Sequence, residues 1–256
     1  MDDADPMNYE SWYSVRSATF VFDNTAPQVT ILSPASGINY YNSLLTISGT
    51  AVDATSAVEK VEIAIRRDDG AFWEDINGDG VGSWVSVNPS TPIPTVLITQ
   101  NNWQYVLSNN NLWSYNRTYQ IYARAWDVPG TTSTWTTPRS FVYDNLSATA
   151  TVLSPLNWAG ANITFVQGTA IDVPSGIKTL EVAIKEVATN MWWDGISTFS
   201  ATSSQYTSTS SWVSGTPNQW QWTLPPLQNG FEYQLRVRTV DNAGNTRIQD
   251  ITPTFI

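Results

Sequence analysis

An internal repeat constrains the fold of this chain more than any other feature of the sequence. Residues 46–53 (TISGTAVD) match residues 165–172 (FVQGTAID), an offset of 119 positions. The same offset carries 58–65 (VEKVEIAI) onto 177–184 (IKTLEVAI), and later blocks keep their order. Self-similarity at this period, in a chain of 256 residues, indicates two domains built on one plan.

The pattern within each repeat is typical of β-strands. Val61, Ile63 and Ile65 alternate with polar or small residues, and the matching segment of the second repeat does the same. Asn77-Gly78 and Asn229-Gly230 are dipeptides that form tight hairpin turns. No stretch keeps a helical period for three turns. We therefore predict an all-β chain of two tandem antiparallel β-sandwiches.

The repeat also predicts the domain boundaries. The segment TFVFDN at 19–24 recurs as SFVYDN at 140–145, where it closes the first repeat, and begins again as TFI at the end of the chain. The expected parts are the last strand of a preceding repeat with its linker at 1–23, the first sandwich at 24–144, and the second sandwich, with a truncated final strand, at 145–256.

Composition excludes several classes of function. The chain contains no Cys and no His, which removes disulfides, thiolate nucleophiles, Cys/His zinc sites and Ser-His-Asp triads. A net charge of −10 argues against binding to nucleic acid or to an anionic membrane surface, and no apolar run is long enough to span a membrane. A polar surface with only 13% charged residues favours an extracellular or cell-surface module that is not an enzyme.

One segment carries a resemblance to known families. Residues 224–238 (LPPLQNGFEYQLRVR) look like the corner between the fifth and sixth strands of fibronectin type III and related Ig-like domains, with Tyr233 as the corner tyrosine. Residues 241–245 (DNAGN) and the linker 23–27 (DNTAP) resemble the bacterial Ig-like repeats of large surface and adhesin-type proteins. The resemblance implies the sandwich fold and a role as a structural or adhesive repeat.

Thirteen Trp residues form the most unusual part of the composition. Trp103 and Trp220 occupy matching positions on alternating strands, so we expect them in the core. Others flank the long central hairpin loops, where large exposed aromatics would indicate contact with a glycan or a protein. These candidate ligand-binding residues are Trp73, Trp84, Trp192, Trp193 and Trp212.

Calcium is the one cofactor that the sequence suggests, and one candidate loop lies in the first repeat. The segment from Asp75 through Asn77 and Asp79 matches the first half of a D-x-N-x-D-G calcium loop, in which alternating oxygens surround a hard cation. The second half lacks the expected Glu, because Ser86 stands in its place. A hairpin tip made of two turn dipeptides is the alternative.

A second prediction of calcium follows from the topology of an Ig-type sandwich, in which two loops meet the incoming chain at the same end. Carboxylates that converge there repel one another unless a cation lies among them. The alternative is that each Asp only caps its own turn. The converging residues would be Asp144, Asp172 and Asp241 in the second repeat, and Asp23, Asp53 and Asp127 in the first.

Two functions remain open at this point. The chain is either a stalk or filament segment, or a module that binds carbohydrate or protein through its Trp-rich loops. The expected partners are neighbouring repeats, copies of the same chain that could be arranged head to tail, or a surface glycan or protein. We also expect residues 17–22, an apolar strand without its own domain, to add to a sheet edge in this chain or in another copy.

Overall fold

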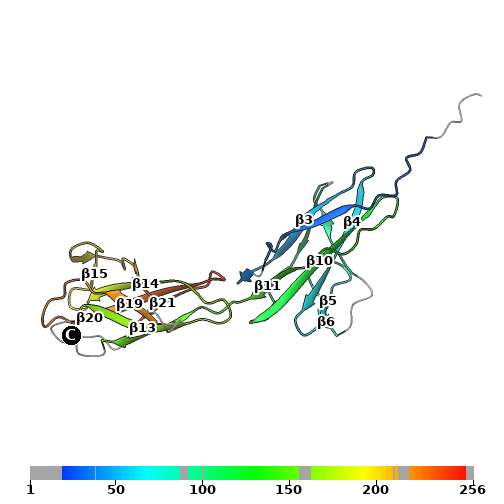
Figure 1. Cartoon of the computed structure of the whole chain (residues 1–256). Helices are drawn as coiled ribbons and strands as arrows, with labels where there is room; N and C mark the ends of the chain where they lie inside the picture. The colour runs from blue at the N-terminus through cyan, green and yellow to red at the C-terminus, as the bar shows by residue number, and fades with distance from the viewer. Residues whose placement is uncertain are drawn as a thin grey trace, which may run out of the picture.

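A computed structural model describes residues 19–37, 39–86, 92–99, 101–155, 163–209, 211–212 and 219–251. All regular structure in these residues is β-structure, arranged as two sandwiches that lie end to end (Figure 1). No helix in the described part of the chain is long and apolar enough to cross a membrane.

The first sandwich is formed by strands β1 to β11. One sheet has the order β1-β3-β9-β8, and the other has the order β2-β11-β10-β4-β5-β6, with β7 also paired to β4. The bounds are β1 Gln28–Ser33, β2 Asn39–Tyr41, β3 Thr46–Val52, β4 Val58–Arg67, β5 Phe72–Glu74, β6 Ser83–Val85, β7 Ile93–Pro94, β8 Val96–Leu97, β9 Asn102–Val106, β10 Arg117–Asp127 and β11 Arg139–Tyr143.

The second sandwich repeats this arrangement with strands β12 to β21. Its sheets have the orders β12-β13-β19-β18 and β16-β15-β14-β20-β21, with β17 also paired to β14. The bounds are β12 Thr149–Ser154, β13 Phe165–Ile171, β14 Ile177–Glu186, β15 Met191–Trp193, β16 Phe199–Ala201, β17 Thr207–Ser208, β18 Ser211–Trp212, β19 Gln219–Thr223, β20 Tyr233–Asp241 and β21 Thr246–Asp250.

A tryptophan lying on a glycine forms the centre of each core. Trp103 and Trp220 are 0% and 1% exposed, which confirms the prediction that both belong to the core. A Cβ added to Gly49 would lie 1.9 Å from the carbonyl oxygen of Thr30 and 2.5 Å from the Trp103 ring. A Cβ added to Gly168 would lie equally close to the carbonyl oxygen of Thr151, on the neighbouring strand β12, and to the Trp220 ring. The glycine shared by the two repeats is therefore required because any larger side chain would collide with the indole ring and with the adjacent backbone.

The tyrosine corner is present in both repeats. The hydroxyl of Tyr119 accepts a hydrogen bond from the backbone N–H of Ser114 at 2.7 Å, and that of Tyr233 accepts one from Gln228 at 2.9 Å. Both tyrosines are buried. The corner seen in the sequence of the second repeat thus occurs in the first repeat as well, where the preceding loop is different.

The apolar segment before the first sandwich forms no strand in its described part. Phe20, Val21 and Phe22 are 85%, 77% and 76% exposed, and residues 19–27 run as an extended segment leading into β1. Pairing of residues 19–22 with a sheet edge of the same chain is therefore not observed, and pairing with another copy stays a prediction. Residues 17 and 18 of the predicted strand, like the end of the chain at 252–256, lie outside the described residues.

Candidate metal centres

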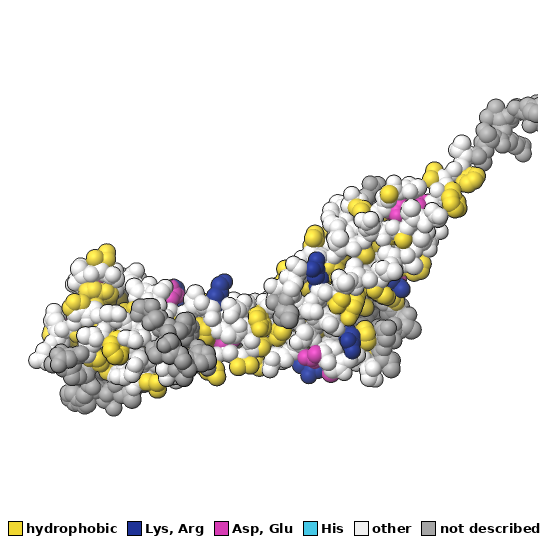
Figure 2. All heavy atoms as spheres, viewed as in Figure 1, with side chains coloured by type: hydrophobic (Ala, Val, Ile, Leu, Met, Phe, Trp, Pro, Cys, Tyr) yellow, Lys and Arg dark blue, Asp and Glu magenta, His cyan; other side chains and the backbone are white. Residues whose placement is uncertain are grey.

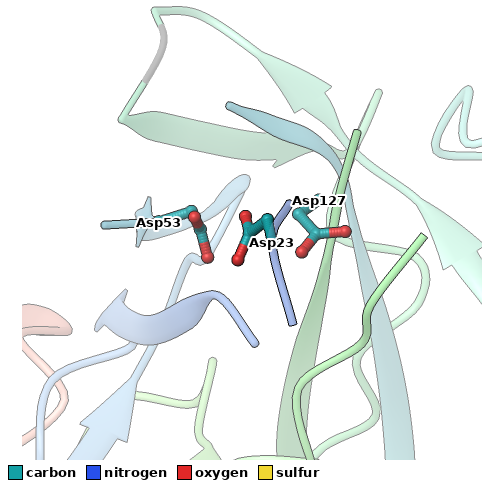
Figure 3. Close-up of side chains that lie close together, drawn as sticks. All are labelled: Asp23, Asp53 and Asp127. Atoms are coloured by element: carbon teal, nitrogen blue, oxygen red, sulfur yellow. The ribbon is translucent and has the colours of Figure 1, made fainter. Parts of the chain in front are cut away.

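The structure brings the six predicted aspartates together in two groups of three. In the first group Asp23 precedes β1, Asp53 follows β3, and Asp127 ends β10. One oxygen from each carboxylate lies within 4.8 Å of the oxygens of the other two. Figure 3 shows the three side chains converging from separate segments. We call this group the first triad.

The second triad occupies the matching place in the second repeat. Asp144 follows β11, Asp172 follows β13, and Asp241 ends β20, again with oxygens within 4.8 Å of one another. Because Asp144 comes directly after the last strand of the first sandwich, this triad lies where one sandwich leads into the next (Figure 1).

Each carboxylate caps its own turn with one of its oxygens. In the first triad Asp23 Oδ1 accepts from the N–H of Thr25 at 2.9 Å, and Asp53 Oδ1 accepts from the N–H of Ser56 at 2.8 Å. The aspartates that end β10 and β20 accept from backbone N–H groups four residues later. The turn caps that the alternative requires are thus present, but they account for only part of each side chain.

Four of the remaining oxygens have no donor in the protein. The Oδ2 atoms of Asp23, Asp53, Asp127 and Asp144 are buried and accept no hydrogen bond from the protein. Asp127 and Asp144 have fully buried side chains. A buried carboxylate oxygen without a donor is costly, and two like charges about 4 Å apart repel by roughly 4 kcal/mol near a protein surface. A cation between these oxygens would remove both penalties.

The charges of the triads affect nearby titratable groups. Burial raises the pKa of Asp172, and the neighbouring carboxylates of Asp144 and Asp241 raise it further. In the first triad the pKa of Asp23 is lowered, chiefly by the side-chain hydroxyl of Thr25 and then by that of Ser56. The neighbouring carboxylates thus contribute to the raised pKa of Asp172, whereas hydrogen bonds from hydroxyl groups dominate at Asp23.

The second triad is linked to the first sandwich by further contacts. The hydroxyl of Tyr115 donates to the carbonyl oxygen of Val173, next to Asp172. The side-chain amide of Asn245 donates to Asp241 Oδ2 and to the carbonyl oxygen of Asp144, both at 2.8 Å. Sequence reasoning assigned neither Tyr115 nor Asn245 to the site. The DNAGN motif offered a signal for Asn245, whereas nothing in the sequence marks Tyr115.

The calcium loop predicted at Asp75, Asn77 and Asp79 is a hairpin tip. Both oxygens of Asp75 already have donors, with Oδ1 accepting from Gly78 N–H and Oδ2 accepting from Gly80 N–H and the hydroxyl of Tyr105. Asp79 caps Val81. The prediction of a cation here is not supported, because the turn itself uses the buried carboxylate.

The loop tryptophans do not form an exposed row. Trp73 and Trp192 are 7% and 6% exposed, so the expectation of an exposed binding row is wrong for these two. Trp84 and Trp193 are half-buried and pack against the core of their own repeat. The side chain of Trp212 lies outside the described residues. The four described indoles therefore belong to the packing of their own repeats.

Comparison with known proteins agrees with this fold. Residues 27–123 match the family model described as a bacterial Ig domain. The first repeat is thus similar to a bacterial Ig domain over these residues. The described part of the second repeat has a similar strand order, without a counterpart of β2, and the same glycine–tryptophan contact, so the chain consists of two tandem Ig-like sandwiches.

Solved structures and curated proteins add little to this assignment. Fibronectin(III)-like modules of Clostridium thermocellum CbhA are 14% identical, with a TM-score of 0.42 over 90% of this chain and 93% of theirs. A tetra-tandem repeat from the extending region of a large adhesion protein is 14% identical, with a TM-score of 0.32 over 90% of this chain and 49% of that one. No curated protein matches the sequence.

Proposed function

We propose that this chain is a non-catalytic stalk segment of a bacterial surface or secreted protein, in which calcium at each aspartate triad stiffens the repeat array. The second triad would join the two sandwiches to each other. The first triad would fix the segment that leads into the first sandwich. The observation that carries this proposal is the set of buried carboxylate oxygens that no protein donor satisfies.

The chemistry of the donors selects the cation. The sites offer only oxygen ligands, and the absence of Cys and His removes the ligands that zinc or copper would prefer. Calcium accepts six to eight oxygens in flexible geometry, whereas magnesium demands an octahedron and releases its water reluctantly. Loop carboxylates from three separate segments suit the less demanding ion. Extracellular modules bind calcium at roughly 10⁻⁴–10⁻³ M, which is enough in a calcium-rich medium.

Thermal unfolding of the metal-free chain, with and without calcium, tests the proposal. Calcium at several millimolar should raise the unfolding midpoint, and a chelator should reverse the rise. Asp127→Asn and Asp241→Asn should each remove part of the response, because each neutralises one carboxylate of one triad. Calorimetric titration of the intact chain should give two calcium ions bound.

Asp194→Asn is the matched control. Asp194 also caps its own turn, accepting from Ile196 N–H at 2.8 Å and Ser197 N–H at 2.7 Å, but it belongs to neither triad. This variant should keep the full calcium response. A midpoint that ignores both calcium and chelator, or a response that Asp127→Asn and Asp241→Asn leave intact, would disprove the cation clamp.

Small-angle X-ray scattering tests the mechanical part of the proposal. Binding at the second triad should narrow the distribution of distances between the two sandwiches, because the joint loses freedom. Asp241→Asn should abolish this narrowing, while Asp127→Asn should preserve it. An identical scattering profile with and without calcium would contradict a stiffened joint.

A further inference from the structure

A hollow lies on the outward face of the first sandwich, and it involves none of the six triad aspartates. Its volume is about 210 Å³, and its lining is formed by Ala64, Phe72, Tyr122 and Trp135. Trp135 is 38% exposed. Figure 2 shows hydrophobic side chains beside basic ones over the region of the first sandwich where Figure 1 places β10 and β5.

The register of the sheet builds this hollow. Ala64 on β4 pairs with Tyr122 on β10, and Arg66 on β4 pairs with Phe72 on β5. Residues two apart on a strand share a face, so Ala64 and Arg66 point the same way. The small Ala64 therefore leaves a gap between aromatic neighbours, and those rings form its walls.

The rim of the hollow carries hydrogen-bonding groups and excess positive charge. Arg66 is exposed, donates to Gln120 Oε1 at 3.3 Å, and has no carboxylate within salt-bridge distance among the described residues. Arg124 lies 4.7 Å from the centre of the Trp135 ring. The acidic group beside it, Glu62, already accepts from Lys60, Arg124 and Trp126. On a chain of net charge −10, this face is locally basic.

The second repeat uses the same register but carries other side chains at the matching positions. Ala183 pairs with Arg236, where the first repeat has Ala64 and Tyr122. The Arg236 guanidinium lies 4.6 Å from the centre of the Trp192 ring and forms a salt bridge with Asp250 at 2.6 Å. In that repeat a cation covers the aromatic ring and is neutralised. In the first repeat the Arg66 guanidinium likewise lies 6.0 Å from the centre of the Phe72 ring, but no carboxylate among the described residues neutralises it. Its charge is therefore available to a ligand.

We propose that this hollow of the first repeat binds a sugar ring that carries a carboxylate. One face of a pyranose presents only C–H groups, which pack on an aromatic ring, while its edge presents hydroxyls to Tyr122 and Gln120. A guanidinium without a carboxylate partner matches the carboxylate of a ligand with two parallel hydrogen bonds, and this is the role of Arg66. Aromatic walls with a few polar groups at the rim are the usual composition of a small-molecule site.

Binding of matched acidic and neutral saccharides to the intact chain tests the proposal. Suitable pairs are methyl glucuronide with methyl glucoside, and 3′-sialyllactose with lactose. Saturation-transfer NMR at low salt should show an acidic probe bound through the C–H protons of one sugar face. In a titration, the affinity of the acidic probe should be at least tenfold higher than that of its neutral partner. Arg66→Gln should remove most of this preference.

Substitutions in the walls locate the site. Tyr122→Ala and Trp135→Ala should each weaken binding at least tenfold, and Trp135→Phe should retain it. Ile248→Ala is the control, because Ile248 is an exposed apolar residue on β21 of the second repeat. The calcium response, which involves other residues, should be unchanged in all of these variants. Absence of binding by both acidic probes, equal affinity for the neutral partners, or binding that survives Tyr122→Ala and Trp135→Ala would overturn the proposal.

Discussion

The two aspartate triads occupy the same place in their repeats but differ in how the protein satisfies them. In the first triad Asp23, Asp53 and Asp127 each keep a buried oxygen without a donor. In the second triad only Asp144 does, because the amide of Asn245 donates to Asp241. Ser175 and Gly176 likewise donate to Asp172. The protein itself therefore supplies more of the donors of the second triad than of the first, so under the proposed clamp the first triad would depend more on the cation.

The largest expected effect concerns what the repeats share. Gly49→Ala and Gly168→Ala should each destabilise their own sandwich by about 3 kcal/mol or more, because the new methyl group meets a backbone carbonyl that cannot move aside. Calorimetry should show a lower unfolding temperature for the substituted sandwich and an unchanged one for the other sandwich. Similar losses of stability in both variants would confirm that the two cores are packed in the same way. An alanine tolerated in either repeat would contradict this.

The two triads should differ in their affinity for calcium. At a concentration one hundred times the dissociation constant, a bound ion adds about 2.7 kcal/mol to stability. We expect the first triad to bind more tightly, since three of its oxygens lack donors. In Asp241→Asn, where only the first triad is complete, the calcium-induced rise of the midpoint should therefore exceed that in Asp127→Asn. The reverse order would show that Asn245 assists the ion and does not replace it.

Removal of the Asn245 side chain should affect the metal-free chain by a smaller amount. Asn245→Ala removes donors to Asp241, to the Asp144 carbonyl and to the Leu146 carbonyl, at a cost of about 1–2 kcal/mol. It should also enlarge the calcium response of the second triad, because Asp241 regains a free oxygen. Thr131→Ala is the control in the first repeat, where only the backbone N–H of Thr131 contacts the triad. Chelator and calcium melts of both variants would measure the difference.

The smallest effect is expected at the tyrosine corners. Tyr119→Phe and Tyr233→Phe each remove one acceptor of a backbone N–H, at a cost of about 1 kcal/mol. The two losses of unfolding free energy, measured by urea unfolding, should agree within a few tenths of a kcal/mol, since the tyrosine corner is common to both repeats. A much larger loss in the first repeat would indicate that its aromatic cluster of Trp113, Tyr119 and Phe141 depends on the hydroxyl.

Much of the fold could be predicted from the sequence, because strand periodicity and turn residues are local properties. The sandwich fold and the placement of Trp103 and Trp220 in the core follow from alternation and from the repeat. The two triads could also be predicted, since Ig topology brings the ends of defined strands to one end of the sandwich. The loop tryptophans could not be placed in this way. Burial of Trp73 depends on which rings the hairpin folds over, and that is a long-range property.

By itself, the sequence determined that two β-sandwiches repeat, and that aspartates meet at one end of each. These properties depend on residue type, on period and on strand order, all of which can be counted along the chain. Only the tertiary structure decided that the remaining carboxylate oxygens of the first triad are buried without donors, and that Asp75 already has donors for both oxygens. It also decided that Ala64 leaves a hollow between Phe72, Tyr122 and Trp135. Burial and hydrogen-bond partners are set by segments distant in sequence, so no local pattern could reveal them.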